Sequence, residues 1–176
     1  MGRTVATKSA FSHNRGMNKA VFLDRDGVIM PDNGHVLAVE QVNVPEEVGG
    51  LLKRLSEAGY LLLIVTNQSA IGHGWLTFDT LDAIHREMKA ELNKVGAHID
   101  SIYTCPHTSN DDCRCRKPRT GLLDMAISQH WVDPSLSWLI GDRQTDIVAG
   151  AWVGVRGIHI DSPDMLAQAV DTILGA

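Results

Sequence analysis

The sequence predicts an α/β fold in which helices cover both faces of a parallel sheet. Short apolar runs alternate along the chain with longer amphipathic segments. The apolar runs lack the alternating polar residues of a half-exposed strand, so both faces of the sheet are expected to be buried. The chain has 176 residues, 44% of them hydrophobic, which is enough to form one core without disulfides. We therefore expect a doubly wound, Rossmann-like sheet of about five parallel strands.

The first half of the chain is predicted to contribute three strands and two helices. Apolar runs predict strands over residues 19–23, 60–65 and 99–104. Apolar residues recur every three or four positions in residues 45–59 and 78–95, which is the spacing of a helix with one buried face. Each helix would cross over the sheet between two parallel strands.

The second half continues the alternation with the order of the elements unchanged. Residues 122–130 are predicted to be helical, and the run LSWLI predicts a strand over 136–140. A helix over 144–152, a strand over 156–160 and a closing helix over 163–174 complete the predicted fold.

The charge balance is mildly acidic, with 16 Lys and Arg against 21 Asp and Glu and a formal net charge of −5. Such a chain lacks the basic surface that binds nucleic acid or an anionic membrane. Residues 61–65 form the longest apolar stretch, which is too short to cross a membrane. We expect a cytoplasmic monomer with residues 18–176 as a single domain. Residues 1–17, which contain basic but no acidic side chains, are expected to be a flexible tail.

Polar motifs follow four of the predicted strands, where parallel sheets bind their ligands. They are DRDG at 24–27, TNQS at 66–69, CPH at 105–107 and GDRQTD at 141–146. Each motif alone is compatible with an ordinary turn or helix cap. Four of them at one edge of a sheet indicate a binding or catalytic site.

The residues of these motifs suit phosphoryl transfer. Asp24, Asp26 and Asp142 would form a carboxylate cluster of the kind that Mg²⁺ prefers. A bound cation would relieve their repulsion and stabilise charge on a transferring phosphoryl group. One carboxylate can attack phosphorus to form an aspartyl phosphate. The Thr66 hydroxyl, backbone amides and the Lys117 ammonium would hold the phosphate oxygens.

The three cysteines of the chain all lie between residues 105 and 115. With one histidine they have the spacing of a tetrahedral Zn²⁺ site, whose ligands would be Cys105, His107, Cys113 and Cys115. The alternative of buried cysteines and a surface histidine is disfavoured, because the intervening TSNDD is too polar for a core. Since protein fills all four positions, we expect a structural Zn²⁺ site that orders the segment carrying Arg116 and Lys117.

The motifs DRDG, TN, the lysine of RKP and GDRxTD, in that order, resemble the four motifs of the haloacid dehalogenase (HAD) phosphohydrolase superfamily. Within it, CPH, CRCRKP and GDR resemble the small heptose-bisphosphate and histidinol-phosphate phosphatase family, over about residues 19–160. The resemblance implies that Asp24 is the nucleophile and Asp26 the general acid and base. It also implies that Mg²⁺ is bound by the Asp24 side chain, the Asp26 backbone carbonyl and Asp142, with Asp146 as an outer support.

The same resemblance assigns the phosphoryl group to Thr66 and Lys117 and a substrate contact to Arg116. The intervals in which HAD enzymes carry a cap domain are already filled by predicted elements, so we expect a HAD fold without a cap. The loop over residues 28–45 and the Zn²⁺ loop would then shape the pocket. The candidate substrate contacts are Asp32, Asn33, Gly34, His35, Asn67, Gln68, Ser69, Arg116 and Arg143.

The two branches of the family share features with this chain. NGHV and SAIGHG resemble the heptose branch, whereas GDRQTDI and the short spacer in the Zn²⁺ loop resemble the histidinol branch. Val28, Met30 and His73 depart from the usual motifs. A cationic histidinol amine would be repelled by Arg116 unless Asp32 compensated.

The expected substrate is therefore a small sugar phosphate, D-glycero-D-manno-heptose 1,7-bisphosphate, dephosphorylated at position 7 as in the synthesis of lipopolysaccharide precursors. Histidinol phosphate is the alternative substrate. A nucleic-acid 3′-phosphatase and an inactive binding module are less favoured, the first because the chain is acidic and the second because the catalytic carboxylates and Lys117 are all present.

Overall fold

The computed structural model describes residues 17–162 and 164–175 of the chain. At its centre is a parallel five-stranded sheet with the order β3-β2-β1-β4-β5. The strands are β1 (Ala20–Leu23), β2 (Leu61–Asn67), β3 (Ser101–Cys105), β4 (Trp138–Gly141) and β5 (Arg156–His159). The predicted α/β class and parallel sheet are confirmed. The expected tail lies outside the described residues except for Met17.

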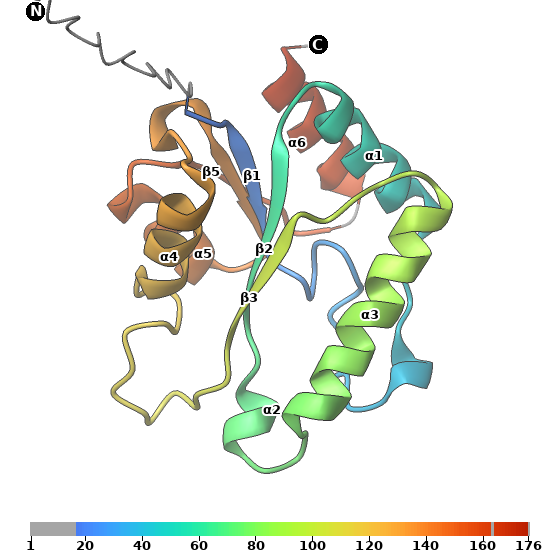
Figure 1. Ribbon diagram of the computed structural model, residues 1–176, viewed down its shortest axis with the longest axis vertical. Helices are drawn as coiled ribbons and strands as arrows, with labels where there is room; N and C mark the ends of the chain where they lie inside the picture. Colours follow the sequence, from blue (N-terminus) through green and yellow to red (C-terminus); the bar gives the residue numbers. More distant parts are fainter. Residues whose placement is uncertain (1–16, 163, 176) are drawn as a thin grey trace, which may run out of the picture.

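Helices cover both faces of this sheet (Figure 1). One face carries α1 (Glu46–Glu57), α3 (Phe78–Lys94) and α6 (Asp164–Leu174), and α1 contacts the other two. The other face carries α4 (Gly121–His130) and α5 (Gln144–Trp152). The described helices include none that is long and apolar enough to cross a membrane.

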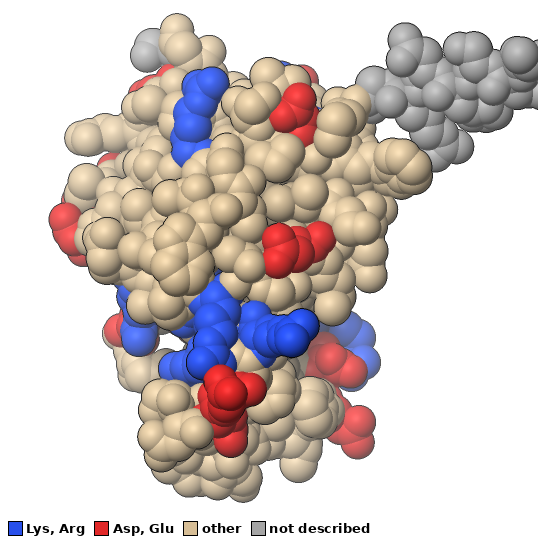
Figure 2. Space-filling view, turned by 90° about the vertical axis from the view of Figure 1, so that its left-hand side faces the viewer, with Lys and Arg blue, Asp and Glu red and all other residues tan. Residues whose placement is uncertain are grey.

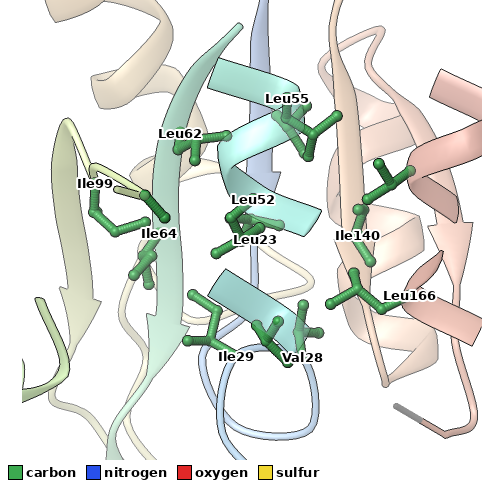
Figure 3. Close-up of a cluster of buried hydrophobic side chains, with 14 of the residues drawn as sticks. Leu23, Val28, Ile29, Leu52, Leu55, Leu62, Ile64, Ile99, Ile140 and Leu166 are labelled. Carbon is green, nitrogen blue, oxygen red and sulfur yellow. The ribbon is translucent and has the colours of Figure 1, made fainter. Parts of the chain in front are cut away.

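The larger core lies between the sheet and the layer of α1, α3 and α6 (Figure 3). Leu52 and Leu55 of α1 and Leu166 of α6 point toward the strands, and none of the three side chains is exposed. On the opposite face, Phe22 and Leu63 pack toward α4 and α5 in a second core. Because successive residues of one strand enter opposite cores, the strands have to be apolar throughout, as the sequence predicts.

Three short helical segments were not predicted. They are the 3₁₀ helices η1 (Val39–Gln41) and η2 (Pro134–Leu136) and the four-residue helix α2 (Ser69–Gly72). The segment η2 replaces the start of the strand expected over residues 136–140, because Pro134 begins a 3₁₀ turn and the Asp133 side chain accepts a hydrogen bond from the Ser135 amide at 2.9 Å. Among the described residues, the interval after β1 contains only η1 and α1, and the interval after β2 contains only α2 and α3, so neither holds a separate cap domain.

The register of the sheet brings the polar strand ends together. Leu23 in β1 is opposite Ile64 in β2 and Ile140 in β4. The residues that follow β1 and β4 therefore leave the sheet side by side. The chain adds β2 and β3 on one side of β1 and then β4 and β5 on the other, so the strand order reverses between β1 and β4. Such a reversal is the usual binding position in a doubly wound sheet.

Candidate active site

Three carboxylates meet at the carboxyl edge of the sheet. Asp24 follows β1, Asp142 follows β4, and Asp146 lies in the first turn of α5. One oxygen from each lies within 4.8 Å of the others. The backbone amide of Arg143 donates to Asp146 Oδ2 at 3.0 Å, which fixes the Asp146 side chain at the start of α5. This arrangement concentrates negative charge in a partly buried position.

Two glycines allow the carboxylates to come so close. Gly27 has a φ of +84°, and a Cβ atom at this position would overlap the Asp142 carboxylate. A Cβ atom at Gly141 would overlap the Asp146 side chain in the same way. Only Gly27 also needs the left-handed backbone region, which side chains disfavour. The glycines of DRDG and GDR thus make room for the acidic side chains.

Lys117 is the cation that lies inside this group of acids. Its ammonium lies 3.2 Å from Asp24 Oδ1 and 2.7 Å from Asp146 Oδ1, and it donates to the Val65 carbonyl oxygen at 2.7 Å. The side chain is only 3% exposed. Burial lowers the pKa of Lys117, but the two carboxylates outweigh burial and raise the pKa above its usual value. Lys117 therefore carries its charge at neutral pH.

One ammonium does not neutralise three carboxylates. Burial, and then repulsion from Asp24 and Asp146, raises the pKa of Asp142 to about 6. Asp142 Oδ1 is buried and has no hydrogen-bond partner among the described residues. A buried oxygen of this kind calls for a cation or a proton. The donor set, hard carboxylate oxygens beside an open pocket, fits Mg²⁺.

The side chain of Asp26 lies elsewhere than in this carboxylate group. Its oxygens accept hydrogen bonds from Arg25 Nε at 3.0 Å, Arg25 Nη2 at 2.9 Å and Gln68 Nε2 at 2.8 Å. The expected cluster of Asp24, Asp26 and Asp142 side chains is thus replaced by one with Asp146, because Arg25 holds the Asp26 carboxylate. The backbone-carbonyl ligand that the family resemblance implies for Asp26 stays a prediction.

The end of β2 contributes hydrogen bonds that fix its neighbours. Thr66 Oγ1 accepts from Gln68 Nε2 at 2.9 Å, which leaves the Thr66 hydroxyl hydrogen free to be donated. The Asn67 side chain exchanges two hydrogen bonds with the backbone of Lys117, at 3.1 and 3.3 Å. The amides of Asn67 and Gln68, which the sequence suggests as substrate contacts, are therefore engaged with the protein. Ser69 begins α2 at the edge of the pocket.

These groups line a pocket of about 550 Å³. Its lining contains most of the residues that the sequence predicts, namely Asp24, Asp26, Asp32, Gly34, His35, Thr66, Asn67, Gln68, Ser69, Arg116, Lys117, Arg143 and Asp146. Asn33 instead lines a neighbouring hollow of about 240 Å³. Arg143 donates to Asp32 at 2.9 Å, and Arg116 donates to the His107 carbonyl oxygen at 3.1 Å. The pocket thus combines carboxylates with three cationic side chains.

An aromatic group that the sequence did not indicate borders the pocket. The rings of His35 and Trp75 meet edge to face with centroids 5.3 Å apart, and His73 stacks on Trp75 at 4.5 Å. Trp75 is 57% exposed. These contacts connect the loop after β1 with the loop after α2. The sequence assigns no role to Arg25 or Trp75, nor to Gln144 and Thr145, which also line the pocket. None of these residues occupies a motif position with a chemical role.

The Cys3His cluster, made of Cys105, His107, Cys113 and Cys115, forms in the structure as the spacing predicts. Cys105 Sγ lies 3.8 Å from Cys113 Sγ and 3.2 Å from Cys115 Sγ, and His107 Nδ1 lies 3.2 Å from Cys115 Sγ. Ligand atoms about 2.3 Å from a tetrahedral Zn²⁺ would be separated by about 3.8 Å. The cluster is therefore compatible with Zn²⁺.

Comparisons with known proteins agree with this geometry. A family model described as "HAD-hyrolase-like" matches residues 114–169. The D-glycero-beta-D-manno-heptose-1,7-bisphosphate 7-phosphatase of Haemophilus influenzae is 38% identical over 146 residues, which are 80% of this chain and 79% of that protein. The Helicobacter pylori protein of the same name is 38% identical over 134 residues, 76% of this chain and 78% of that one.

Solved structures give the same result. The D,D-heptose 1,7-bisphosphate phosphatase from B. bronchiseptica, complexed with magnesium and phosphate, has a TM-score of 0.83 and 27% sequence identity. The match covers 89% of this chain and 98% of that one. The D,D-heptose 1,7-bisphosphate phosphatase from Burkholderia thailandensis is 30% identical, with a TM-score of 0.62, over 86% of this chain and 85% of that one.

Proposed function

The chain belongs to the HAD-like family that contains the heptose-1,7-bisphosphate 7-phosphatases, and from this we propose that it removes the 7-phosphate of D-glycero-D-manno-heptose 1,7-bisphosphate. The reaction would be the hydrolysis of a phosphate monoester through an aspartyl phosphate. The observation that carries the proposal is one pocket that is lined by Asp24 and Lys117 and also by two further cations, Arg116 and Arg143. The Lys117 ammonium lies 3.2 Å from Asp24, whereas Arg143 is paired with Asp32 at 2.9 Å and Arg116 donates to the His107 carbonyl oxygen.

Asp24 is the proposed nucleophile. Its Oδ1 atom accepts the Arg25 amide at 2.7 Å and faces Lys117 at 3.2 Å, so the carboxylate is held in one orientation at the pocket floor. An oriented carboxylate can attack phosphorus without first losing much conformational freedom. Lys117 and the free hydroxyl hydrogen of Thr66 would donate to the equatorial phosphoryl oxygens, on which charge accumulates in the transition state.

Asp26 is the proposed general acid and base. It would give a proton to the departing 7-hydroxyl oxygen of the sugar, and later accept a proton from the water that attacks the aspartyl phosphate. The Asp26 side chain lines the pocket and is 20% exposed, so it can reach both substrate and water. A Mg²⁺ ion held by Asp24, Asp142 and the Asp26 carbonyl would neutralise phosphate charge during the reaction.

Arg116 and Arg143 favour a substrate with a second anionic group. Guanidinium forks bind phosphate through paired hydrogen bonds. The carboxylate of Asp32 is paired with Arg143 at 2.9 Å, so among these three side chains one positive charge remains. Asp32 is then engaged and does not compensate Arg116 for a cationic ligand. This supports a sugar bisphosphate over histidinol phosphate, whose amine would be repelled by the Arg116 guanidinium.

The face shown in Figure 2 gives little support to a nucleic-acid substrate. Figure 2 shows the face over α4, α5 and the Cys3His loop, where basic side chains in the lower half are bordered by acidic ones. Arg119 of this loop is paired with Asp112 at 2.7 Å. A backbone-binding groove would need unpaired basic residues along its length. The charge distribution therefore favours the small-molecule substrate that the pocket suggests.

A side-by-side assay tests the substrate. With Mg²⁺ present, kcat/KM is measured for heptose 1,7-bisphosphate, histidinol phosphate and a 3′-phosphorylated oligonucleotide. We expect the bisphosphate to be preferred by about a hundredfold, the size of effect that two lost charge-assisted contacts produce. A higher kcat/KM for histidinol phosphate would overturn the substrate proposal and leave the aspartyl-phosphate mechanism standing.

Two variants test the roles proposed for Asp24 and Arg116. Asp24→Asn should fold and retain almost no turnover, whereas near-normal turnover would refute the mechanism. Arg116→Ala should lower kcat/KM about tenfold more for the bisphosphate than for a sugar 7-monophosphate. The reason is that Arg116 would bind the second phosphate, which the monophosphate does not have. The matched control is Arg114→Ala, two residues away, which lines a different hollow and should leave both values unchanged.

A further inference from the structure

His85 is a buried histidine that the proposed reaction does not use. It lies on the buried side of α3, and 8% of its surface is exposed. An isolated histidine at helical spacing is usually structural, so the sequence indicates no function for it. In the structure its Nε2 atom lies 3.3 Å from Arg25 Nη1. Because a guanidinium can only donate, Nε2 accepts, and the ring proton of the neutral imidazole lies on Nδ1.

Arg25 is the side chain that His85 contacts, and it is completely buried. Its Nε donates to Asp26 Oδ1 at 3.0 Å, and its Nη2 donates to Asp26 Oδ2 at 2.9 Å. Nη2 also donates to Gln68 Oε1 at 2.9 Å. A buried guanidinium is tolerated only when its donors are paired. Within the described part of the chain, only His85 contacts Nη1, so it holds the guanidinium nitrogen that Asp26 and Gln68 do not bind.

The donors of this network fill most of the acceptor positions of the Asp26 carboxylate. Each carboxylate oxygen has room for about two donors. Oδ2 receives two, from Arg25 Nη2 and Gln68 Nε2. Oδ1 receives one, from Arg25 Nε. Oδ1 therefore keeps one acceptor position that these donors do not fill, and the pocket is where the carboxylate is open to solvent.

We propose that His85 is a positioning residue which, through Arg25, orients Asp26 so that Oδ1 alone exchanges a proton with the substrate. This inference rests on the proposed function. In the first half-reaction a proton leaves Oδ1 for the ester oxygen, while the bond from phosphorus to that oxygen breaks and the bond to the Asp24 carboxylate forms. In the second, a water proton returns to Oδ1, the water oxygen bonds to phosphorus, and the bond to Asp24 breaks.

Orientation matters here because proton transfer requires the acid to be within hydrogen-bond reach of the reacting oxygen. A carboxylate that can rotate would present either oxygen and spend time facing the wrong direction. Arg25 and Gln68 hold both oxygens by hydrogen bonds, and the contact of His85 with Nη1 restrains the guanidinium from turning. The contribution of His85 should thus be visible only where the leaving group needs a proton.

The experiment compares His85→Met, which removes the acceptor at similar volume, with His85→Gln, whose Oε1 can accept from Arg25. kcat/KM is measured for heptose 1,7-bisphosphate and for p-nitrophenyl phosphate, whose acidic leaving group needs no proton. We expect His85→Met to lose about tenfold on the bisphosphate and less than about twofold on the aryl ester. His85→Gln should recover most of the loss. The exposed His98→Ala serves as the control and should change neither value.

Asp26→Asn provides the reference for this readout. If wild-type protein hydrolyses neither ester, or if Asp26→Asn loses equally on both, the proposed function itself fails. If Asp26→Asn discriminates between the esters but His85→Met loses equally on both or on neither, only the role of His85 is refuted. Arg25→Lys is the second variant. It keeps a charge without the fork and should show the same discrimination, and an equal loss on both esters would also refute the inference.

Discussion

Replacing Lys117 with Met is the change that most directly tests the balance of charge in the site. The substitution keeps an unbranched chain of similar length and removes the ammonium from between two carboxylates. Asp24 and Asp146 then lose their contacts at 3.2 and 2.7 Å, and Asp142 stays beside them. We expect the Mg²⁺-free variant to be strongly destabilised and the Mg²⁺-bound variant much less so.

The magnitude follows from the geometry. At these separations the attraction of each pair is about 5 to 6 kcal/mol for an effective dielectric constant of about 20. Removing a buried ammonium also removes its own desolvation cost, so the measured loss for one deleted partner of a buried pair is about 3 to 5 kcal/mol. Mg²⁺ at a hundred times its Kd returns about 2.7 kcal/mol. Because Lys117→Met strips the competing cation, Mg²⁺ should stabilise the variant more than the wild type.

The assay is urea unfolding of both proteins, dialysed into Mg²⁺-free buffer without chelator so that the Cys3His cluster is unaffected, and again with excess Mg²⁺. Lys53→Met is the matched control, because the Lys53 ammonium lies 3.8 Å from Glu57 with both side chains largely exposed. It should change the free energy of unfolding by less than about 0.5 kcal/mol. A loss below about 1 kcal/mol for Lys117→Met, or equal stabilisation of both proteins by Mg²⁺, would refute the reasoning.

Three further predictions concern stability and metal binding. Burial, and then the charge of Arg25, lowers the pKa of His85 to about 4, so the neutral ring contributes stability above pH 6.5 that is lost as the pH falls toward 4. Relative to His85→Gln, the wild type should lose up to about 3 kcal/mol over that range in urea titrations, and a constant difference would contradict this. Gly27→Ala should weaken Mg²⁺ binding and cost about 2 kcal/mol more than Gly34→Ala, since both have positive φ but only the Gly27 Cβ meets Asp142; equal calorimetric affinities would exclude the steric argument. Purified protein should hold about one equivalent of Zn²⁺ by atomic emission, its removal should lower the melting temperature before it lowers activity, and metal-free protein with an unchanged melting curve would refute a structural Zn²⁺ site.

The sheet could be predicted because its signal is redundant. Each strand is apolar on both faces, and each helix repeats its apolar side chains over several turns, so one exception does not change the result. Segments of three or four residues, such as η1 and α2, carry no such periodicity. Their conformation depends on single caps and on packing against elements distant in sequence, as for the Asp133 cap of η2.

The site was predictable to the level of which loops meet, because motif order places Asp24, Thr66, Lys117 and Asp142 at one edge of the sheet. The direction of each side chain was not. Arg25 lies between two aspartates and reads as an exposed charge, yet it is fully buried and determines where the Asp26 carboxylate points. The burial of Arg25 depends in part on its contact with His85 of α3, which is 60 residues away in sequence and which no local pattern indicates.

The placement of Lys117 shows how a loop can hold a buried ammonium with such accuracy. Cys115 of the Cys3His cluster lies just before it, and Arg116 donates to the His107 carbonyl oxygen at 3.1 Å, so the segment is attached to the cluster twice. Asn67 then ties the Lys117 backbone to the end of β2 through two hydrogen bonds. The hydrogen bonds from Asn67 do not depend on a metal. The Lys117 ammonium is therefore positioned by the sheet as well as by the cluster. We therefore expect the cluster to act on the reaction by limiting the motion of a loop already docked on β2, so that its effect appears in stability first.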